Sequence, residues 1–182
     1  MKKTAIFVSA VWFCLTLSAT AARPADELVA QACARAGREH KTVLVMFHAS
    51  WCKYCKKLEA VLALPEVGRV IDRHFVPLWL TVMERGELKA TENPGAAELL
   101  KELARGASTG IPYCACLDSR GRLRSDSMFT PEGAKEPGNI GFPVSEEETA
   151  AFLAMLRKGA PRLTAAELDT LKGGIASLRP DK

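Results

Sequence analysis

Two cysteines, Cys52 and Cys55, stand three positions apart in the segment WCKYC. The continuous apolar run over 42–47 just before them predicts a buried strand, and the pattern from Cys52 onward is helical. On the first turn of a helix, this spacing brings the two sulfur atoms within disulfide reach. The sequence therefore predicts a cysteine pair that opens and closes as a redox dithiol without movement of the fold.

The two thiols are predicted to have different roles. The partial positive charge at the helix N-terminus, joined by Lys53, Lys56 and Lys57, is expected to stabilise a thiolate. Cys52, the more exposed of the two, is predicted to be the attacking thiol, and Cys55 resolves the mixed disulfide. The same lysines could equally form a solvated helix face.

Two other uses of this pair stay open at the level of sequence. Together with Cys114 and Cys116, the pair Cys52 and Cys55 could form a soft-metal site, for which His48 is another candidate ligand, in a metal-binding or metal-delivery protein. A permanent structural disulfide would instead leave an inert adaptor. The simpler interpretation of Cys114 and Cys116 is that they are two small buried residues on one strand face.

The first residues have the layout of a secretory signal peptide. Lys2 and Lys3 precede an apolar run over 5–17, and small residues follow it. We predict a signal peptide over residues 1–21, because the apolar run is shorter than the roughly 20 residues that cross a bilayer. The protein is then expected to be exported, periplasmic or extracellular, where a dithiol is either kept reduced or meant to be oxidised.

The remaining chain alternates predicted helices and strands, which is typical of an α/β fold. The predicted elements of the first half are a helix that ends at Gly37, a strand over 42–47, helices from Cys52 and from Pro65, a strand over 75–82 and a helix introduced by Asn93 and Pro94. A hairpin with strands over 111–117 and 122–128 follows, then a long loop over 130–143. We assign residues 22–160 to one domain and residues 161–182 to a C-terminal helical extension.

Capping boxes predict the starts of the last two helices, at Ser145 with Glu148 and at Thr164 with Glu167.

Composition excludes several classes of protein. The chain has 182 residues, of which 48% are hydrophobic and 25% charged, so it is neither disordered nor fibrous. A formal net charge of +4 gives little electrostatic support for nucleic-acid binding. Six cysteines are too few for a disulfide scaffold of this length. Cys33 is predicted to be a core residue, and His40 and His74 to be surface or boundary residues.

Several segments together resemble the thioredoxin-like family, of the secreted bacterial type. They are FHASWCKYCKKLE over 47–59, PEV over 65–67, HFVP over 74–77 and GIP over 110–112. The resemblance covers roughly residues 25–157. It implies a mixed sheet of about four strands flanked by helices, here with an extra C-terminal helix. It also implies that Pro112 is a cis-proline beside the cysteine pair, and that the backbone of Ile111 binds a substrate strand.

The chain departs from this family in three features. Met46 occupies the position of a buried acid that helps to deprotonate the resolving thiol, so general-base help from that position is not expected. The family's usual first strand is missing. The Lys53-Tyr54 pair between the cysteines matches neither the Gly-Pro of the reductant nor the Pro-His of the strong oxidant.

The resemblance implies a thiol–disulfide oxidoreductase that acts on protein thiols and disulfides and needs no bound cofactor. We expect a reductase or isomerase rather than a strong oxidant. Trp51, Lys53 and Tyr54, with Ile111 and Pro112, are the candidate substrate-binding residues. An electron donor or acceptor would be another thiol protein, which could be membrane-bound, and the 130–143 loop is expected to contribute to partner recognition. The residues assign no oligomeric state.

Overall fold

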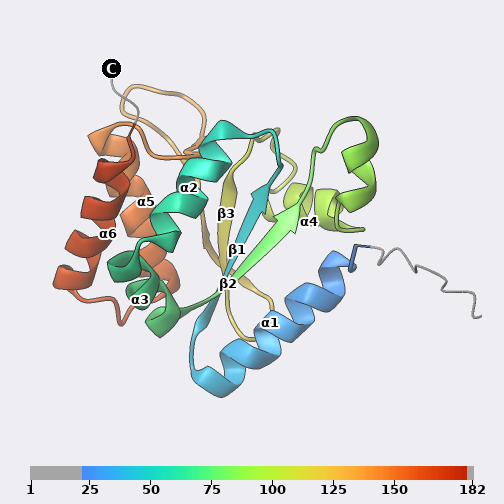
Figure 1. Cartoon of the computed structure of the whole chain (residues 1–182). Coiled ribbons are helices and arrows are strands. Elements are labelled where there is room, and N and C mark those ends of the chain that lie inside the picture. The colour runs from blue at the N-terminus through green and yellow to red at the C-terminus, as the bar shows by residue number, and fades with distance from the viewer. Residues whose placement is uncertain (1–21, 180–182) are drawn as a thin grey trace, which may run out of the picture.

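A central four-stranded sheet is covered by helices on both faces (Figure 1). The computed structural model describes residues 22–179, so the predicted signal peptide over residues 1–21 lies outside the described residues. The strands lie in the order β2-β1-β3-β4. They are β1 (Thr42–His48), β2 (Phe75–Thr81), β3 (Tyr113–Leu117) and β4 (Leu123–Asp126). The predicted α/β class with a sheet of about four strands is confirmed.

The sheet is mixed because its central strand has two different neighbours. Strand β1 pairs in parallel with β2 and antiparallel with β3, and β3 pairs antiparallel with β4. A parallel pair needs a crossover connection, and two helices that follow β1 supply it. These helices are α2 (Lys53–Ala63) and α3 (Pro65–His74).

The side chains on both faces of strand β1 are buried in a hydrophobic core, as its continuous apolar run predicts. Leu44 and Met46 belong to one core cluster, with residues of α2, α3 and the C-terminal helices. Val43, Val45 and Phe47 belong to the other cluster, which α1 and α4 cover. The remaining helices are α1 (Ala25–Glu39), α4 (Ala96–Leu103), α5 (Glu146–Gly159) and α6 (Ala165–Ser177).

Two helix boundaries differ from the sequence prediction. Helix α1 continues through Gly37 and ends at Glu39, where His40 adopts a left-handed conformation with φ 54°. Helix α4 begins only at Ala96, after a 3-10 helix η1 (Gly86–Thr91). Asn93 does not cap α4, because its side chain accepts a hydrogen bond from the backbone N–H of Thr81 at 2.8 Å.

The predicted hairpin is interrupted before its second strand is complete. Strand β4 ends at Asp126, and the next residues form β5 (Met128–Phe129). β5 pairs antiparallel with β6 (Gly138–Asn139), so the 130–143 segment is tied down by a two-stranded sheet rather than being wholly irregular. This pairing joins residues about ten positions apart, which local periodicity does not indicate.

The two C-terminal helices complete one face of the core. Both predicted capping boxes are present, at the starts of α5 and α6. Leu171 and Ile175 of α6 are buried in the same cluster as Leu58 of α2 and Val67 of α3. Among residues 22–179, no helix combines the length and the apolar character that crossing a membrane requires.

Candidate active site

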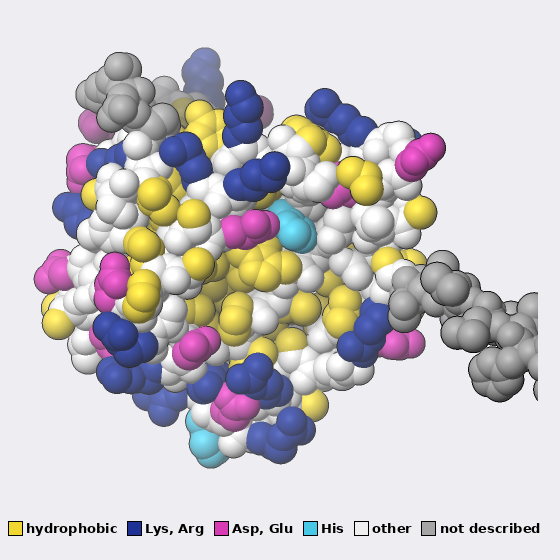
Figure 2. Space-filling model, viewed as in Figure 1, with side chains coloured by type: hydrophobic (Ala, Val, Ile, Leu, Met, Phe, Trp, Pro, Cys, Tyr) yellow, Lys and Arg dark blue, Asp and Glu magenta, His cyan; other side chains and the backbone are white. Residues whose placement is uncertain are grey.

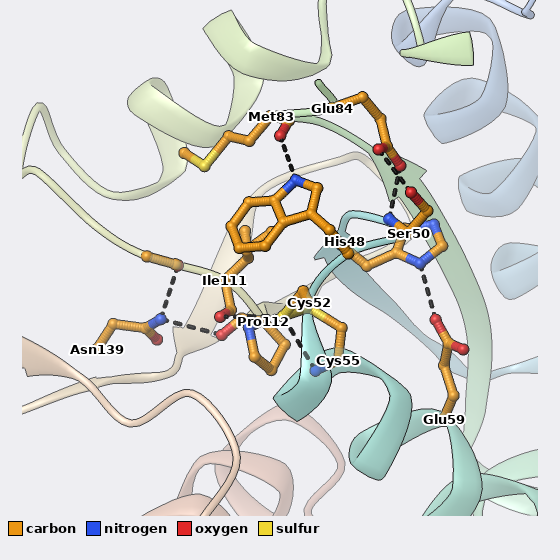
Figure 3. Close-up of a disulfide and its surroundings, with 12 residues drawn as sticks. His48, Ser50, Cys52, Cys55, Glu59, Met83, Glu84, Ile111, Pro112 and Asn139 are labelled. Atoms are coloured by element: carbon orange, nitrogen blue, oxygen red, sulfur yellow. Dashed lines mark hydrogen bonds and ion pairs between the residues drawn. A yellow bond between two sulfur atoms is a disulfide. The ribbon is translucent and has the colours of Figure 1, made fainter. Parts of the chain in front are cut away.

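The cysteine pair lies at the junction between β1 and α2 (Figure 3). Cys52 and Cys55 form a disulfide with their Cα atoms 5.3 Å apart. Cys52 is the N-cap residue of α2, and its Sγ accepts a hydrogen bond from the backbone N–H of Cys55 at 3.1 Å. This position exposes the sulfur to the unpaired N–H groups and partial positive charge of the helix terminus, which favour a thiolate once the disulfide is reduced.

The two sulfur-bearing side chains differ in exposure. Cys52 retains an exposed fraction of 4%, whereas that of Cys55 is 0%. Both pack with Ala49 and with the partly buried Ile111. Of the two sulfur-bearing side chains, only that of Cys52 therefore retains exposed area through which a partner sulfur can approach. Lys53, the first residue of α2, is exposed beside it.

The predicted proline loop lies directly against the pair. The Ile111–Pro112 peptide bond is cis. The carbonyl oxygen of Ile111 lies 3.6 Å from Sγ of Cys52. Asn139 braces this loop, since its side-chain amide donates to the carbonyl oxygens of Gly110 at 2.9 Å and Pro112 at 3.0 Å (Figure 3).

Trp51 and Tyr54 are both exposed and both held in place. The indole N–H of Trp51 donates to the carbonyl oxygen of Met83 at 2.7 Å. The guanidinium of Arg85 lies over the same ring, 3.9 Å from its centroid. Tyr54 stacks on Phe142, with the ring centroids 6.3 Å apart.

Exposed Trp51, Tyr54 and Met83 form an apolar rim beside Cys52. On this side of the molecule, Figure 2 shows Lys and Arg side chains over the start of α2. Two further large apolar residues of the described chain, Leu88 and Val144, are also exposed.

The turn between β1 and α2 is anchored by a buried carboxylate. Glu84 accepts hydrogen bonds from the backbone N–H of Ser50 at 2.6 Å and from its hydroxyl at 2.8 Å. Burial opposes the charged form of Glu84, but the bonds from Ser50 outweigh it and lower the pKa of the carboxyl. An ionised Glu84 thus fixes the backbone directly before Trp51.

Met46 is fully buried, at the position where the resemblance implies an acid. Titratable groups instead lie one helical turn beyond Cys55. Glu59 accepts from Nδ1 of His48 at 2.8 Å, and Nε2 of His48 lies 3.3 Å from the hydroxyl of Thr81. Because Cys55 and Glu59 stand at positions i and i+4, their side chains leave the same face of α2 (Figure 3).

The other cysteines lie apart from this site. Cys114 and Cys116 are 0% exposed and belong to the core cluster with Leu44, not to the cluster of Cys52. Burial raises the pKa of both thiols, that of Cys116 to about 12, so they stay protonated at neutral pH. Their interpretation as buried strand residues is confirmed. Cys33 is buried in the other core cluster, as predicted.

The four cysteines of the alternative metal site, Cys52, Cys55, Cys114 and Cys116, do not form one cluster. Among residues 22–179, no three His, Cys, Asp or Glu side chains are grouped so as to hold a metal ion. Thiols that burial keeps protonated are also poor ligands, since a metal binds the thiolate. The two cysteine pairs therefore have separate environments, and only one of them lies at a helix terminus.

All seven candidate site residues thus lie close together. Several residues that hold them in position are not apparent from the sequence. Glu84 and Asn139 are far along the chain from the residues that they hold, and no local pattern indicates them. The Glu59 contact could have been sought from its helical spacing to Cys55.

Comparison with known proteins agrees with this site. A family model described as a thioredoxin-like domain matches residues 29–132, and the chain belongs to this family. The fold, together with a cysteine pair in disulfide contact at the start of α2, defines a thiol–disulfide oxidoreductase. No curated protein sequence matches the chain.

Three solved structures show how far the likeness extends. A disulphide isomerase from Xylella fastidiosa Temecula1 is 18% identical over 92% of this chain and 98% of its own, with a TM-score of 0.47. The DsbH oxidoreductase is 19% identical over 85% and 96%, with a TM-score of 0.44. The C-terminal domain of DsbD from Neisseria meningitidis is 27% identical over 58% and 84%, with a TM-score of 0.40.

Proposed function

We propose that the protein is exported and exchanges disulfides with protein substrates, acting as a reductase or isomerase. The observation that carries the proposal is the position of Cys52. Its sulfur caps α2, lies next to the carbonyl of Ile111 and is bordered by exposed apolar side chains. A partner sulfur can reach Cys52 from solvent, but not Cys55.

In the proposed reaction, two electrons pass from the dithiol to the substrate. The Cys52 thiolate attacks one sulfur of a substrate disulfide, which forms a mixed disulfide and releases the other sulfur as a thiolate. Cys55 loses its proton and attacks Sγ of Cys52. The Cys52–Cys55 disulfide forms, and the second substrate sulfur leaves as a thiolate. Isomerisation follows when a substrate thiol displaces Cys52 first.

The proton of Cys55 needs an acceptor in this scheme. The pair of His48 and Glu59 supports this role, since Glu59 lies one turn along α2 and is half-exposed. A half-exposed carboxylate exchanges protons readily with water. The pair of His48 and Glu59 would take the role of the buried acid whose position Met46 occupies in this chain.

The rim of apolar side chains supports an unfolded or extended protein segment as substrate. Trp51 and Tyr54 offer flat apolar contacts, and Ile111 offers backbone groups to an extended strand. The 130–143 segment contributes Asn139 to the proline loop, which connects it to partner recognition. The donor of reducing equivalents would be another thiol protein that docks at the same rim.

The direction and the location of the reaction are proposed from the sequence. The Lys53-Tyr54 pair between the cysteines is not the Pro-His pair of the strong oxidant, whose reduced form is unusually stable. The proposed export rests on the charged, apolar and small residues at positions 2–22.

A glutathione redox titration of the purified protein, followed by alkylation and mass spectrometry of Cys52 and Cys55, tests the function. We expect reversible titration with a midpoint between about −270 and about −180 mV. A midpoint near about −120 mV would contradict the proposed direction. A pair that does not titrate would contradict disulfide exchange altogether.

Two variants serve as controls for this titration. Cys52→Ser is expected to lower the rate of disulfide exchange to that of the uncatalysed reaction. Cys55→Ser is expected to accumulate the mixed disulfide on Cys52, because nothing resolves it. Amino-terminal sequencing of protein recovered from the producing cell tests export, and an intact Met1 would contradict it.

A further inference from the structure

A cavity of about 440 Å³ lies at the end of the sheet opposite to the disulfide. Thr42, the first residue of β1, lines it, whereas Cys52 lies beyond the other end of β1, which is His48. A strand of seven residues separates the two regions by about 20 Å. The walls come from the α1–β1 turn, the β3–β4 turn and the α5–α6 connection.

The lining of this cavity is strongly basic. Figure 2 shows Lys, Arg and His side chains, with some Asp and Glu among them, at the lower end of the molecule. Asp118 is the one acidic residue of the lining. Its carboxylate forms an ion pair with the guanidinium of Arg122 at 2.7 Å. The hydrogen bond from the backbone N–H of Arg122 lowers the pKa of Asp118 to about 2; burial opposes this shift and the guanidinium of Arg122 assists it. The five cationic side chains of the lining are Lys41, Arg120, Arg122, Arg124 and Arg162.

Three of these arginines have no carboxylate partner in the part of the chain that the structure describes. Lys41 pairs with Glu39 at 2.5 Å, but Arg120, Arg124 and Arg162 form no ion pair within residues 22–179. Like charges in one cavity repel one another, so the arrangement is costly unless an anion joins them.

Hydrogen bonds that involve backbone groups hold the arginines that have no ion pair. Nη1 of Arg124 donates to the carbonyl oxygen of Gly159 at 3.2 Å, and Nη2 of Arg162 donates to the carbonyl oxygen of His40. The backbone N–H of Arg120 donates to Asp118 at 2.8 Å, which shapes the turn that carries its side chain. Each guanidinium has five N–H donors, so most of them stay available to a ligand.

A buried histidine forms the back wall of the cavity. His74, predicted to be a surface or boundary residue, is only 6% exposed and forms part of the cavity wall. Its Nε2 lies 3.0 Å from Glu167, whereas Nδ1 is buried with no hydrogen-bond partner in the described chain. Protein atoms enclose Nδ1, so the guanidinium groups in front of His74 are the groups that reach a ligand.

We propose that this cavity binds a phosphate-bearing ligand, either a free phosphorylated small molecule or a phospholipid head group. Guanidinium forks match the oxygen atoms of a phosphoryl group, and three unpaired forks call for more than one negative charge. The volume is within the range of small-molecule sites and exceeds a single phosphate ion. The site is independent of disulfide exchange at the other end of the sheet.

Calorimetric titration of the purified protein with pyrophosphate, at a constant chloride concentration, tests the free-ligand form. We expect saturable binding that Arg120→Gln/Arg162→Gln weakens by at least about tenfold. Arg69→Gln/Arg157→Gln is the matched control, because it removes the same charge from exposed helix positions outside the cavity. If the double variant fails to fold, Arg120→Gln alone serves, since its side chain is exposed and forms no hydrogen bond or ion pair within residues 22–179.

Sedimentation with vesicles of phosphatidylglycerol, compared with phosphatidylcholine, tests the head-group form. Binding to the anionic vesicles alone, with the same dependence on Arg120 and Arg162, would assign the ligand to the membrane surface. The proposal is overturned if neither probe binds, or if the cavity variant and the control variant lose affinity equally. Both variants are expected to retain the wild-type rate of disulfide exchange.

Discussion

Cys52 and Cys55 lie at the start of a helix, whereas Cys114 and Cys116 lie inside the strand that flanks β1. The first pair faces a partly exposed rim and forms a disulfide. The second pair is enclosed by α5 and by the core, and burial raises the pKa of its thiols. Residue type and short spacing are nearly the same in both pairs, so the chemistry of a cysteine is decided here by the element that carries it.

The geometry of the two elements explains why only one pair closes. Positions three apart on a helical turn bring side chains together, which allows the Cα separation of 5.3 Å at Cys52 and Cys55. Alternate positions on a strand point to the same face but lie roughly 6.5 to 7 Å apart. In addition, Gly159 packs closely against the side chain of Cys116.

Alkylation of the reduced protein is the most direct way to break this comparison. With iodoacetamide at pH 8, we expect Cys52 to react orders of magnitude faster than Cys116. The pKa of Cys116 is raised to about 12, so raising the pH from 7 to 9 leaves it protonated and unreactive. Peptide mass spectrometry gives the order of modification, with protein in guanidinium chloride as the control in which all thiols react. Comparable rates in the folded protein would refute the contrast.

The packing around the second pair can be tested at Gly159. A Cβ atom at this position would lie 2.5 Å from Sγ and 2.6 Å from Cβ of Cys116, so Gly159→Ala forces overpacking. We expect a loss of about 1–3 kcal/mol in the free energy of unfolding, measured in urea. Gly173→Ala is the control, because open space surrounds this exposed helical position and alanine favours a helix. Equal stability of the two variants would show that β3 tolerates expansion there.

The role of Glu59 sharpens the account of the first pair. Glu59→Gln keeps the shape of the side chain but removes the carboxylate, so we expect disulfide exchange to slow by about tenfold with a changed pH profile. Stopped-flow measurement of the rate against pH separates this from a loss of structure. Glu136→Gln, in the exposed 130–143 segment, is expected to change neither quantity. An unaltered pH profile in Glu59→Gln would remove Glu59 from the proton path.

The smallest expected effect concerns the lysines near the helix start. Lys53→Gln/Lys56→Gln should raise the pKa of the reduced Cys52 thiol slightly, because two exposed positive charges near a thiolate are lost. The pH dependence of absorbance at the thiolate band gives the value. Lys101→Gln/Lys158→Gln removes equal charge elsewhere and is expected to leave the pKa unchanged. If the first double variant also leaves it unchanged, the helix terminus alone stabilises the thiolate.

Much of the fold could be predicted from local patterns. The run over 42–47, the capping boxes at Ser145 and Thr164, and the break at Pro65 each depend on residues that are close in the chain. Such signals fix an element through its own periodicity and termini. The end of the hairpin was predicted wrongly, because β5 pairs with a strand that follows a long connection.

The amino-acid sequence by itself determined the chemistry of this protein: a dithiol at a strand–helix junction, in a segment typical of the thioredoxin-like family. Only the tertiary structure decided what surrounds that dithiol. It brought Glu84 to Ser50 and Asn139 to the proline loop, buried Cys114 and Cys116, and gathered distant arginines around one cavity. Local patterns cannot encode these contacts, because burial and charge pairing depend on which elements the whole chain folds side by side.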